Sequence, residues 1–374
     1  MSFAAAPMVP GDLFDSASRL AAACDARFAR LIEPEARAAL LTEVWQEITA
    51  LGWPAVAVAE EAGGAGGTLR DVAALVEGGA RSALALPLAS AFGVVPLLLA
   101  GAGGAGGEVL AGIAAGTHRV AAAIAPVHGT AAGSPMAARW SDAAPRLSGA
   151  MIGIDCPPDP THFLVTCRIE GEAALLLVPR GDDRVTLRHH ERIDGRPTID
   201  LHFGEDRRLD GTLLARGEAV GEATARALRA GAFLACVEAV AAMGALLEQT
   251  IAYLSNRVQF DAPLASFQAL RHKVAELYVA QENARALVTE LLDRVAAPGA
   301  WPDRDLDLAK LYLGPASRRF AATTIQLHGG MGMTEELPAS RLAKRLLMVE
   351  FEYGDTASHE ARLLAADPLA EASA

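Results

Sequence analysis

Cysteine is scarce in this chain of 374 residues. The four cysteines lie far apart and form no CxxC pair: Cys24, Cys156, Cys167 and Cys236. The first residues, MSFAAAPMVPGDLF, also lack a basic stretch before an apolar one. The sequence therefore predicts no disulfide framework, metal site or secretory leader, and we expect a reduced, cytoplasmic protein.

Basic residues are outnumbered as well. The chain has 33 Lys and Arg against 45 Asp and Glu, and no basic cluster alternates with aromatic residues. Such a chain attracts nucleic acid poorly, so a small metabolite is the expected partner. The one long uncharged run, residues 82–107, contains Pro87, Pro96 and repeated glycines. This composition predicts packed helices joined by a turn and no membrane span.

Three zones differ in their hydrophobic pattern. Up to residue 117, apolar residues recur three and four apart, as in LLTEVWQEITALGW, which predicts helices. Short apolar runs such as HFLVTCR and AALLLVPR, separated by Pro, Gly and Asp, predict strands in residues 118–212. Helical spacing returns in residues 213–374. With 52% hydrophobic residues, we expect an α+β protein whose domains 1–117, 118–212 and 213–374 pack as one body.

Two short motifs suit anion binding. In QLHGGMG, residues 326–332, three glycines interrupt a helical pattern, and a backbone without Cβ atoms can approach a phosphate closely. Taken alone, the motif fits an ordinary glycine C-cap of a helix better. In RVQF, residues 257–260, Arg257 lies where a helix ends. It either stabilises that end or binds a diphosphate through two hydrogen bonds.

Three stretches in combination closely resemble the acyl-CoA dehydrogenase family: residues 48–88, 253–277 and 326–363. RxxF and GGxG occur in the family's order and spacing, and the resemblance covers most of the chain, weakly in the middle zone. It implies an N-terminal helical domain, a middle β-barrel or sandwich domain and a C-terminal four-helix bundle. It also implies a flavoprotein that removes an α proton and a β hydride from an acyl-CoA thioester and passes electrons to an electron-transfer flavoprotein.

The resemblance further implies that FAD lies across an interface between subunits. Its diphosphate arm would contact Gln326 and the backbone of Gly329 and Gly330. The motif residues Arg257, Gln259 and Phe260 would complete the site, with Arg257 on the diphosphate and Phe260 beside the flavin. We expect Gly330→Val to abolish flavin retention, because valine blocks the backbone approach and any positive φ.

The chain departs from the family in places that matter for the cofactor. Asp261 follows RxxF where most members have glycine, and a carboxylate beside a diphosphate weakens binding unless it turns outward or meets a cation. The middle zone lacks the family's flavin-covering loop, with its threonine and glycine, and the strand that contains tryptophan. The stretches AIAPVHGTAAGSP and IGIDCPPDP stand in their places, so no isoalloxazine contact is assigned.

The family's catalytic base is missing from both of its usual positions. Removal of a proton next to a thioester needs a carboxylate in a dry pocket with a raised pKa. Tyr353 and Gly231 occupy the two positions, and a phenol is a poor base at neutral pH. Three carboxylates remain as candidates: Glu238, Glu352 and Asp355.

Each candidate also has a structural interpretation. Glu352 and Asp355 suit solvated positions at a helix end. Glu238, with apolar neighbours on both sides, suits a buried position in which it pairs with Arg226, with Arg229 or with a polar group. We favour Glu238, because a buried carboxylate is the one whose pKa can be tuned.

The eroded motifs and the helix CVEAVAAMGALLEQT look most like the smaller subunits of heteromeric acyl-CoA dehydrogenases, of the pimeloyl-CoA and steroid side-chain types. Three hypotheses stay open. The chain is a dehydrogenase subunit, active alone or with a partner; or a non-catalytic subunit that completes a partner's flavin site; or a relative with other flavin chemistry or DNA binding. The net charge of −12 counts against DNA.

Overall fold

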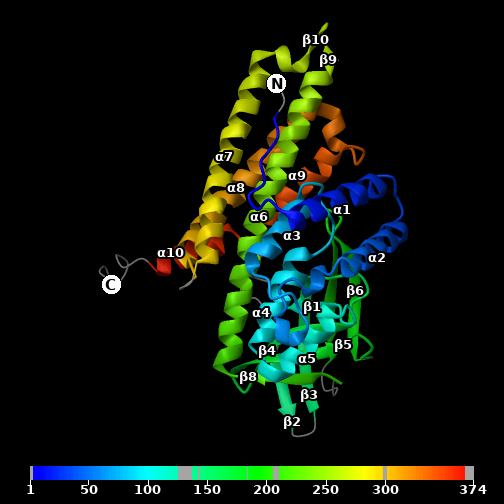
Figure 1. Ribbon diagram of the computed structural model, residues 1–374, viewed down its shortest axis with the longest axis vertical. Coiled ribbons are helices and arrows are strands. Elements are labelled where there is room, and N and C mark those ends of the chain that lie inside the picture. Colours follow the sequence, from blue (N-terminus) through cyan, green and yellow to red (C-terminus); the bar gives the residue numbers. More distant parts are fainter. Residues whose placement is uncertain are drawn as a thin grey trace. The chain divides into compact units, whose positions relative to one another are not determined.

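Helices open and close the chain, and strands occupy its middle (Figure 1). The computed structural model describes residues 3–124, 137–141, 144–182, 184–204, 210–297 and 301–366. The chain forms two compact units, one from Met1–Arg37, Ala73–Leu84 and Ala232–Ala374, the other from Ala38–Val72 and Ala85–Gly231. The predicted α+β class and its order of helices, strands and helices are confirmed. The domain limits 1–117, 118–212 and 213–374 stay a prediction.

The N-terminal helices follow the predicted spacing of apolar residues. They are α1 (Asp12–Phe28), α2 (Pro34–Ala50), α3 (Leu69–Ala80), α4 (Val95–Ala100) and α5 (Gly103–Ala114), with the short turns η1 (Trp53–Ala55) and η2 (Glu60–Ala62) and the π-helix η3 (Ala89–Val94). A Cβ on Gly78 of α3 would lie 2.5 Å from the carbonyl oxygen of Phe14. Glycine at this position therefore lets α1 and α3 pack closely. The uncharged run 82–107 folds as η3, α4 and the start of α5.

The strands pair along an open path. They are β1 (Val120–Ala123), β2 (Ala137–Ser141), β3 (Ala144–Asp155), β4 (His162–Ile169), β5 (Glu172–Pro179), β6 (Val185–Glu191), β7 (Pro197–Phe203) and β8 (Thr212–Arg216). Their order is β6-β7-β3-β2-β4-β5-β8, and β1 adds to β4. The first part of β3 pairs with β2 and the rest, from Gly149, pairs with β7. Among the described strands the path does not close, so the arrangement is an open sheet that bends at β3 and not a barrel.

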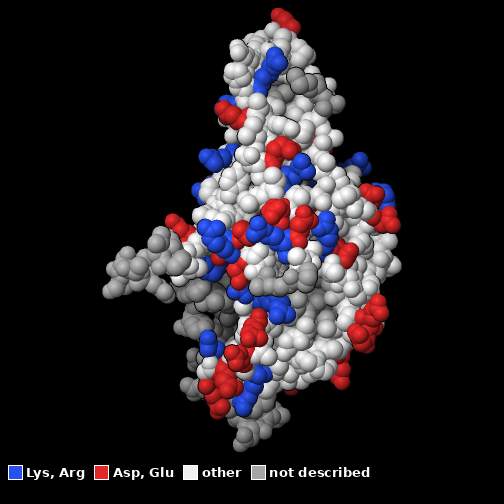
Figure 2. Space-filling view, turned by 60° about the vertical axis from the view of Figure 1, so that its left-hand side comes forward, with Lys and Arg blue, Asp and Glu red and all other residues white. Residues whose placement is uncertain are grey.

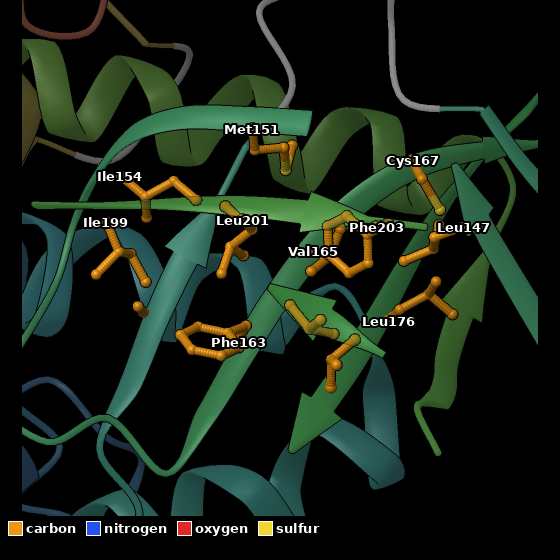
Figure 3. Packing of buried hydrophobic residues seen from close by; sticks show 14 of the residues in the cluster. Leu147, Met151, Ile154, Phe163, Val165, Cys167, Leu176, Ile199, Leu201 and Phe203 are labelled. Carbon is orange, nitrogen blue, oxygen red and sulfur yellow. The ribbon is translucent and has the colours of Figure 1, made fainter. Parts of the chain in front are cut away.

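The core of this sheet lies between the part that contains β4 and β5 and the part that contains β7 (Figure 3). Phe163 and Val165 of β4 are fully buried, as are Ile199 and Leu201 of β7. The alternation places every second residue of each strand on one face, and these are the faces that meet. The middle strands are therefore held by apolar packing of the kind that the sequence predicted for HFLVTCR and its neighbours.

The C-terminal part is helical. It contains α6 (Glu218–Asn256), the hairpin β9 (Val258–Gln259) and β10 (Ala262–Pro263), η4 (Leu264–Ser266), α7 (Gln268–Ala296), α8 (Asp303–His328), η5 (Gly329–Met333), α9 (Pro338–Val349) and α10 (Thr356–Ala365). Of the described helices, α6 alone is long and apolar enough to cross a membrane, and the apolar window that passes this test is buried inside the protein. Core helices of soluble proteins pass the same test.

Charged side chains of both signs are interspersed on the face drawn in Figure 2. Among the described residues of that face, Lys and Arg lie next to Asp and Glu and do not form a basic area of their own. The four cysteines are buried and form no disulfide. The cytoplasmic location stays a prediction.

Candidate cofactor and catalytic site

The glycine-rich hinge begins where α8 ends. Gly329 is the C-cap residue of α8, with φ 60° and ψ −140°, a conformation that only glycine adopts readily. A Cβ on Gly329 or Gly330 would have no atom within 4 Å, and both residues are exposed. The positive φ lies on Gly329 and not on Gly330, so the expected block of a positive φ at Gly330 is wrong. At Gly330, a valine side chain would therefore block only the approach of the backbone to a phosphate.

Gly332 has a different role in the hinge. A Cβ there would lie 2.7 Å from the carbonyl oxygen of Ile325, so the turn packs against α8 only with glycine at this position. The Ser340 hydroxyl donates to the Gly332 carbonyl over 3.0 Å. The hinge is thus fixed at Gly332, while the backbone at Gly329 and Gly330 stays open.

The RVQF motif begins directly after α6 and forms the tip of a hairpin. Gln259 pairs with Ala262 across a two-residue turn, Phe260 and Asp261, whose φ angles are 55° and 61°. Two positive φ values are what a type I′ hairpin turn requires. Arg257 is exposed and Phe260 is 87% exposed, so both side chains are accessible to a partner molecule. Within the described residues, Arg257 has no ion pair or side-chain hydrogen bond.

Tyr253 connects these two motifs. Its hydroxyl donates to the carbonyl oxygen of His328 over 3.2 Å, and the two rings lie 4.6 Å apart between centroids. Tyr253 is one helical turn before Arg257, whose backbone amide donates to the Tyr253 carbonyl over 2.8 Å. Tyr253 was not among the predicted site residues, although its spacing of four residues from Arg257 is visible in the sequence.

The donors gathered here fit a diphosphate. The exposed Arg257 offers a guanidinium, Gln326 offers an exposed amide, and Gly329 and Gly330 leave their backbone open. Asp261, the one carboxylate of the motif, is exposed at the hairpin turn. The residue types and the open glycine backbone are therefore suited to the phosphate arm of a dinucleotide cofactor.

Glu238 lies in a buried ion pair with a residue of α9. Both of its carboxylate oxygens accept from Arg345, at 2.7 Å from Nε and 2.5 Å from Nη2. Arg345 Nη2 also donates to Glu352 over 2.7 Å. The structure therefore brings Glu238 and Glu352 together through one guanidinium. We expected Arg226 or Arg229 as the partner of Glu238, and the cation that holds both its oxygens is Arg345 instead.

The third candidate, Asp355, caps the N-terminus of α10. It accepts from the backbone amide of Ser358 over 2.8 Å and from the Ser358 hydroxyl over 2.6 Å. These hydrogen bonds lower the pKa of Asp355, whereas a base for this reaction needs a raised pKa. Asp355 thus lies at a helix end, as expected, where it is the N-cap residue of α10. Glu352, in contrast, is 9% exposed at its side chain and is not solvated.

One face of α8 holds the turn that contains Tyr353. The buried Lys310 ammonium donates to the carbonyl oxygens of Val349 and Glu352, at 2.9 Å and 2.7 Å. Two turns further along α8, Arg318 forms an ion pair with Glu350. Tyr353 itself has a φ of 55° and is half-buried. The sequence analysis did not identify Lys310, whose burial lowers its pKa.

Two stretches stand where the family has its flavin-covering loop and its tryptophan-containing strand. AIAPVHGTAAGSP lies outside the described residues from residue 125 onward. In IGIDCPPDP, Gly153 has a φ of 69° where β3 shifts its register, and Asp155 binds Arg192 over 3.0 Å. The end of β3 is thus occupied by an ion pair of the domain's own residues.

Comparison with protein-family models gives two matches, one before the strands in the sequence and one after them. "Acyl-CoA dehydrogenase, N-terminal domain" matches residues 12–117, and "Acyl-CoA dehydrogenase, C-terminal domain" matches residues 221–366. The chain belongs to the acyl-CoA dehydrogenase family. The cofactor of this acyl-CoA dehydrogenase fold is FAD.

Individual acyl-CoA dehydrogenases are similar to this chain over different lengths. IpdE2 of Mycolicibacterium smegmatis is 30% identical over 168 residues, 45% of this chain and 50% of that protein. The chain spans about half the length of the curated relatives it matches, 50% and 57% for two of them. The ChsE4–ChsE5 complex from Mycobacterium tuberculosis has the same fold, with a TM-score of 0.80 and 21% identity over 97% of this chain and 100% of that one. A glutaryl-CoA dehydrogenase from Mycobacterium smegmatis in complex with FADH2 follows, with a TM-score of 0.76 and 22% identity over 94% of both chains.

Proposed function

We propose that this chain is one subunit of a heteromeric, FAD-dependent acyl-CoA dehydrogenase, and that an unlike partner chain supplies the catalytic base. The observation that carries the proposal is the turn around Tyr353, where the family has its carboxylate. The carboxylates beside Tyr353 are engaged elsewhere: Glu350 with Arg318, Glu352 with Arg345, and Asp355 with Ser358. Without a replacement, proton abstraction would be slower by about a hundredfold to ten-thousandfold.

In this proposal the chain's own contribution is to hold the cofactor. Arg257 and Gln326 would bind the FAD diphosphate from an exposed surface, and the amides at Gly329 and Gly330 would approach it closely. Bound FAD would accept the β hydride of an acyl-CoA thioester. The exposure of these residues suits a site that another subunit completes. An electron-transfer flavoprotein is the proposed electron acceptor.

Assemblies of similar proteins support the heteromeric form. ChsE4–ChsE5 is described as a complex of two proteins, and Tcur3481–Tcur3483 as a steroid acyl-CoA dehydrogenase. A steroid-derived or other bulky acyl-CoA is the substrate class that this similarity favours. The exposed Phe260 and Met333, at 87% and 79%, provide apolar area for such an interface.

Co-expression tests the proposal directly. The chain should be purified alone and with an unlike acyl-CoA dehydrogenase chain from the same genome, and its visible flavin spectrum and dye-coupled acyl-CoA oxidation should be measured. We expect a dimer or tetramer with very weak oxidation alone, and a yellow, active complex with the partner. Rapid acyl-CoA oxidation by the homomer would overturn the proposal.

A second function is favoured by the end of β3, because the stretch that stands in place of the family's tryptophan-containing strand holds an ion pair of Asp155 with Arg192. In this alternative the chain is a non-catalytic subunit that only completes the partner's flavin site. It would be colourless alone and would make the partner yellow and active. Every substitution in its Glu238 and Glu352 cluster would then leave the turnover of the folded complex unchanged.

A further inference from the structure

The two motifs that face the proposed diphosphate site come from helices far apart in the sequence. Arg257 follows the end of α6, and Gly329 follows the end of α8. A diphosphate bound by both motifs needs their relative position fixed to a fraction of an ångström. The contacts that join the two helix ends are therefore as important as the donors themselves.

Tyr253 makes two contacts across this junction. Its hydroxyl binds the carbonyl oxygen of His328, which lies at the end of α8 immediately before the open glycines. Its ring also packs against the ring of His328, at 4.6 Å and an interplanar angle of 34°. His328 is the last residue of α8 and the N-cap residue of η5, so the phenol binds the backbone at the junction of these two elements.

His328 is itself held in place. Its Nδ1 lies 2.8 Å from the carbonyl oxygen of Thr324, one turn earlier in α8, and the side chain is buried. Burial lowers the pKa of His328, so the ring is neutral and presents an uncharged face to Tyr253. The contact between the two rings thus joins α6 to a part of α8 that cannot rotate freely.

We propose that Tyr253 is a positioning residue that fixes the open Gly329–Gly330 backbone relative to Arg257, so that the two motifs bind the cofactor diphosphate as one site. The proposal rests on the function proposed above. Arg257 directly follows α6, four residues after Tyr253, and its backbone amide donates to the Tyr253 carbonyl over 2.8 Å. Any shift of the hinge away from Tyr253 is a shift away from Arg257 as well.

The test uses the heteromeric complex, stripped of flavin and titrated with FAD. Tyr253→Phe keeps the ring contact and removes one hydrogen bond, so we expect FAD to bind about three- to tenfold more weakly. Tyr253→Leu removes both contacts and should weaken binding further. Tyr312→Phe, on a tyrosine that is 36% exposed on α8, is the matched control and should leave FAD affinity unchanged.

Two further readouts separate positioning from general stability. Amide hydrogen exchange should become faster at residues 329–333 in Tyr253→Phe and stay the same elsewhere. The KM for acyl-CoA should not change in Tyr253→Phe.

The outcomes distinguish this inference from the function on which it rests. If the wild-type complex binds FAD and Tyr253→Phe binds it equally well, the positioning role is wrong and the proposed function stands. If the unaltered chain contributes to no FAD site, alone or with the partner, both are wrong. Should Tyr253→Phe fail to fold, faster exchange confined to residues 329–333 in His328→Leu, which removes the ring that packs against Tyr253, would support the inference, and unchanged exchange would overturn it.

Discussion

The guanidinium of Arg345 binds both carboxylate oxygens of Glu238, although the two residues are 107 positions apart in the chain. This pair joins α9 to the middle of α6, and both side chains are buried. The guanidinium reaches Glu352 as well, in the segment between α9 and α10. One cation thus connects three parts of the C-terminal helical region.

Removal of this cation should destabilise the fold strongly. Arg345→Gln takes the guanidinium away from Glu238 and Glu352, and breaking a buried ion pair costs about 3–5 kcal/mol. The free energy of unfolding in urea measures the loss. The control is Arg285→Gln, because the pair of Arg285 with Glu282 is 35% exposed on both sides and should contribute less than about 1 kcal/mol. Equal losses in the two variants would contradict the structural role of Arg345.

Glu238→Gln tests the candidate base in the active complex. The substitution keeps the shape of the side chain and removes its basicity. If the partner supplies the base, turnover of acyl-CoA by the folded heteromer should stay within about twofold of wild type, since the proton abstraction step is untouched. A fall of a hundredfold or more, with FAD still bound, would identify Glu238 as the base and end the proposal of partner dependence.

Acidification should destabilise the protein through His359. Its Nδ1 lies 2.7 Å from Asp307, while burial, with Arg362 and Lys310 nearby, lowers its pKa from the ordinary 6.5. The unfolded chain then takes up the proton first, so this contribution is complete above pH 6.5 and is lost as the pH falls through the lowered folded pKa. His359→Gln should therefore flatten the loss of unfolding free energy between about pH 7 and pH 5. The same change at the exposed His272 should leave the slope as it is.

Gly330→Val should abolish flavin retention without unfolding the chain. No atom lies within 4 Å of a Cβ at this position, so the side chain enters open space where the diphosphate is proposed to lie. Flavin absorbance after gel filtration and the thermal unfolding midpoint are the measurements. Gly181→Val, at another open glycine, is the control and should keep its flavin. An unchanged flavin spectrum in Gly330→Val would refute the placement.

The sequence predicted the fold better than the site. Helical and strand periodicities depend on local spacing, and they correctly predicted helices, then strands, then helices, but the last strand, β8, runs to Arg216 in the zone predicted as helical. The family motifs placed Arg257 and the hinge correctly at helix ends. The choice between barrel and sandwich stayed open because strand closure depends on which strands pair, and strand patterning does not encode that.

The charged contacts could not be predicted either, because they too depend on the tertiary fold. The partner of Glu238 was sought earlier on its own helix, about two and a half to three turns away, where Arg229 and Arg226 occur. The observed partner, Arg345, comes from another helix, and only the tertiary fold brings it there. A signal was available for Glu352, because Arg345 precedes it by seven residues, two helical turns.

The hairpin tip places two left-handed residues and one carboxylate beside the proposed diphosphate site. Phe260 and Asp261 both adopt the left-handed conformation, which costs an ordinary residue about 1–2 kcal/mol. Asp261→Gly would relieve the backbone and remove a negative charge in a single step. Because the hairpin is exposed, the substitution would leave the packing of the core unchanged. A single substitution, Asp261→Gly, is thus expected to tighten flavin binding while the free energy of unfolding does not fall.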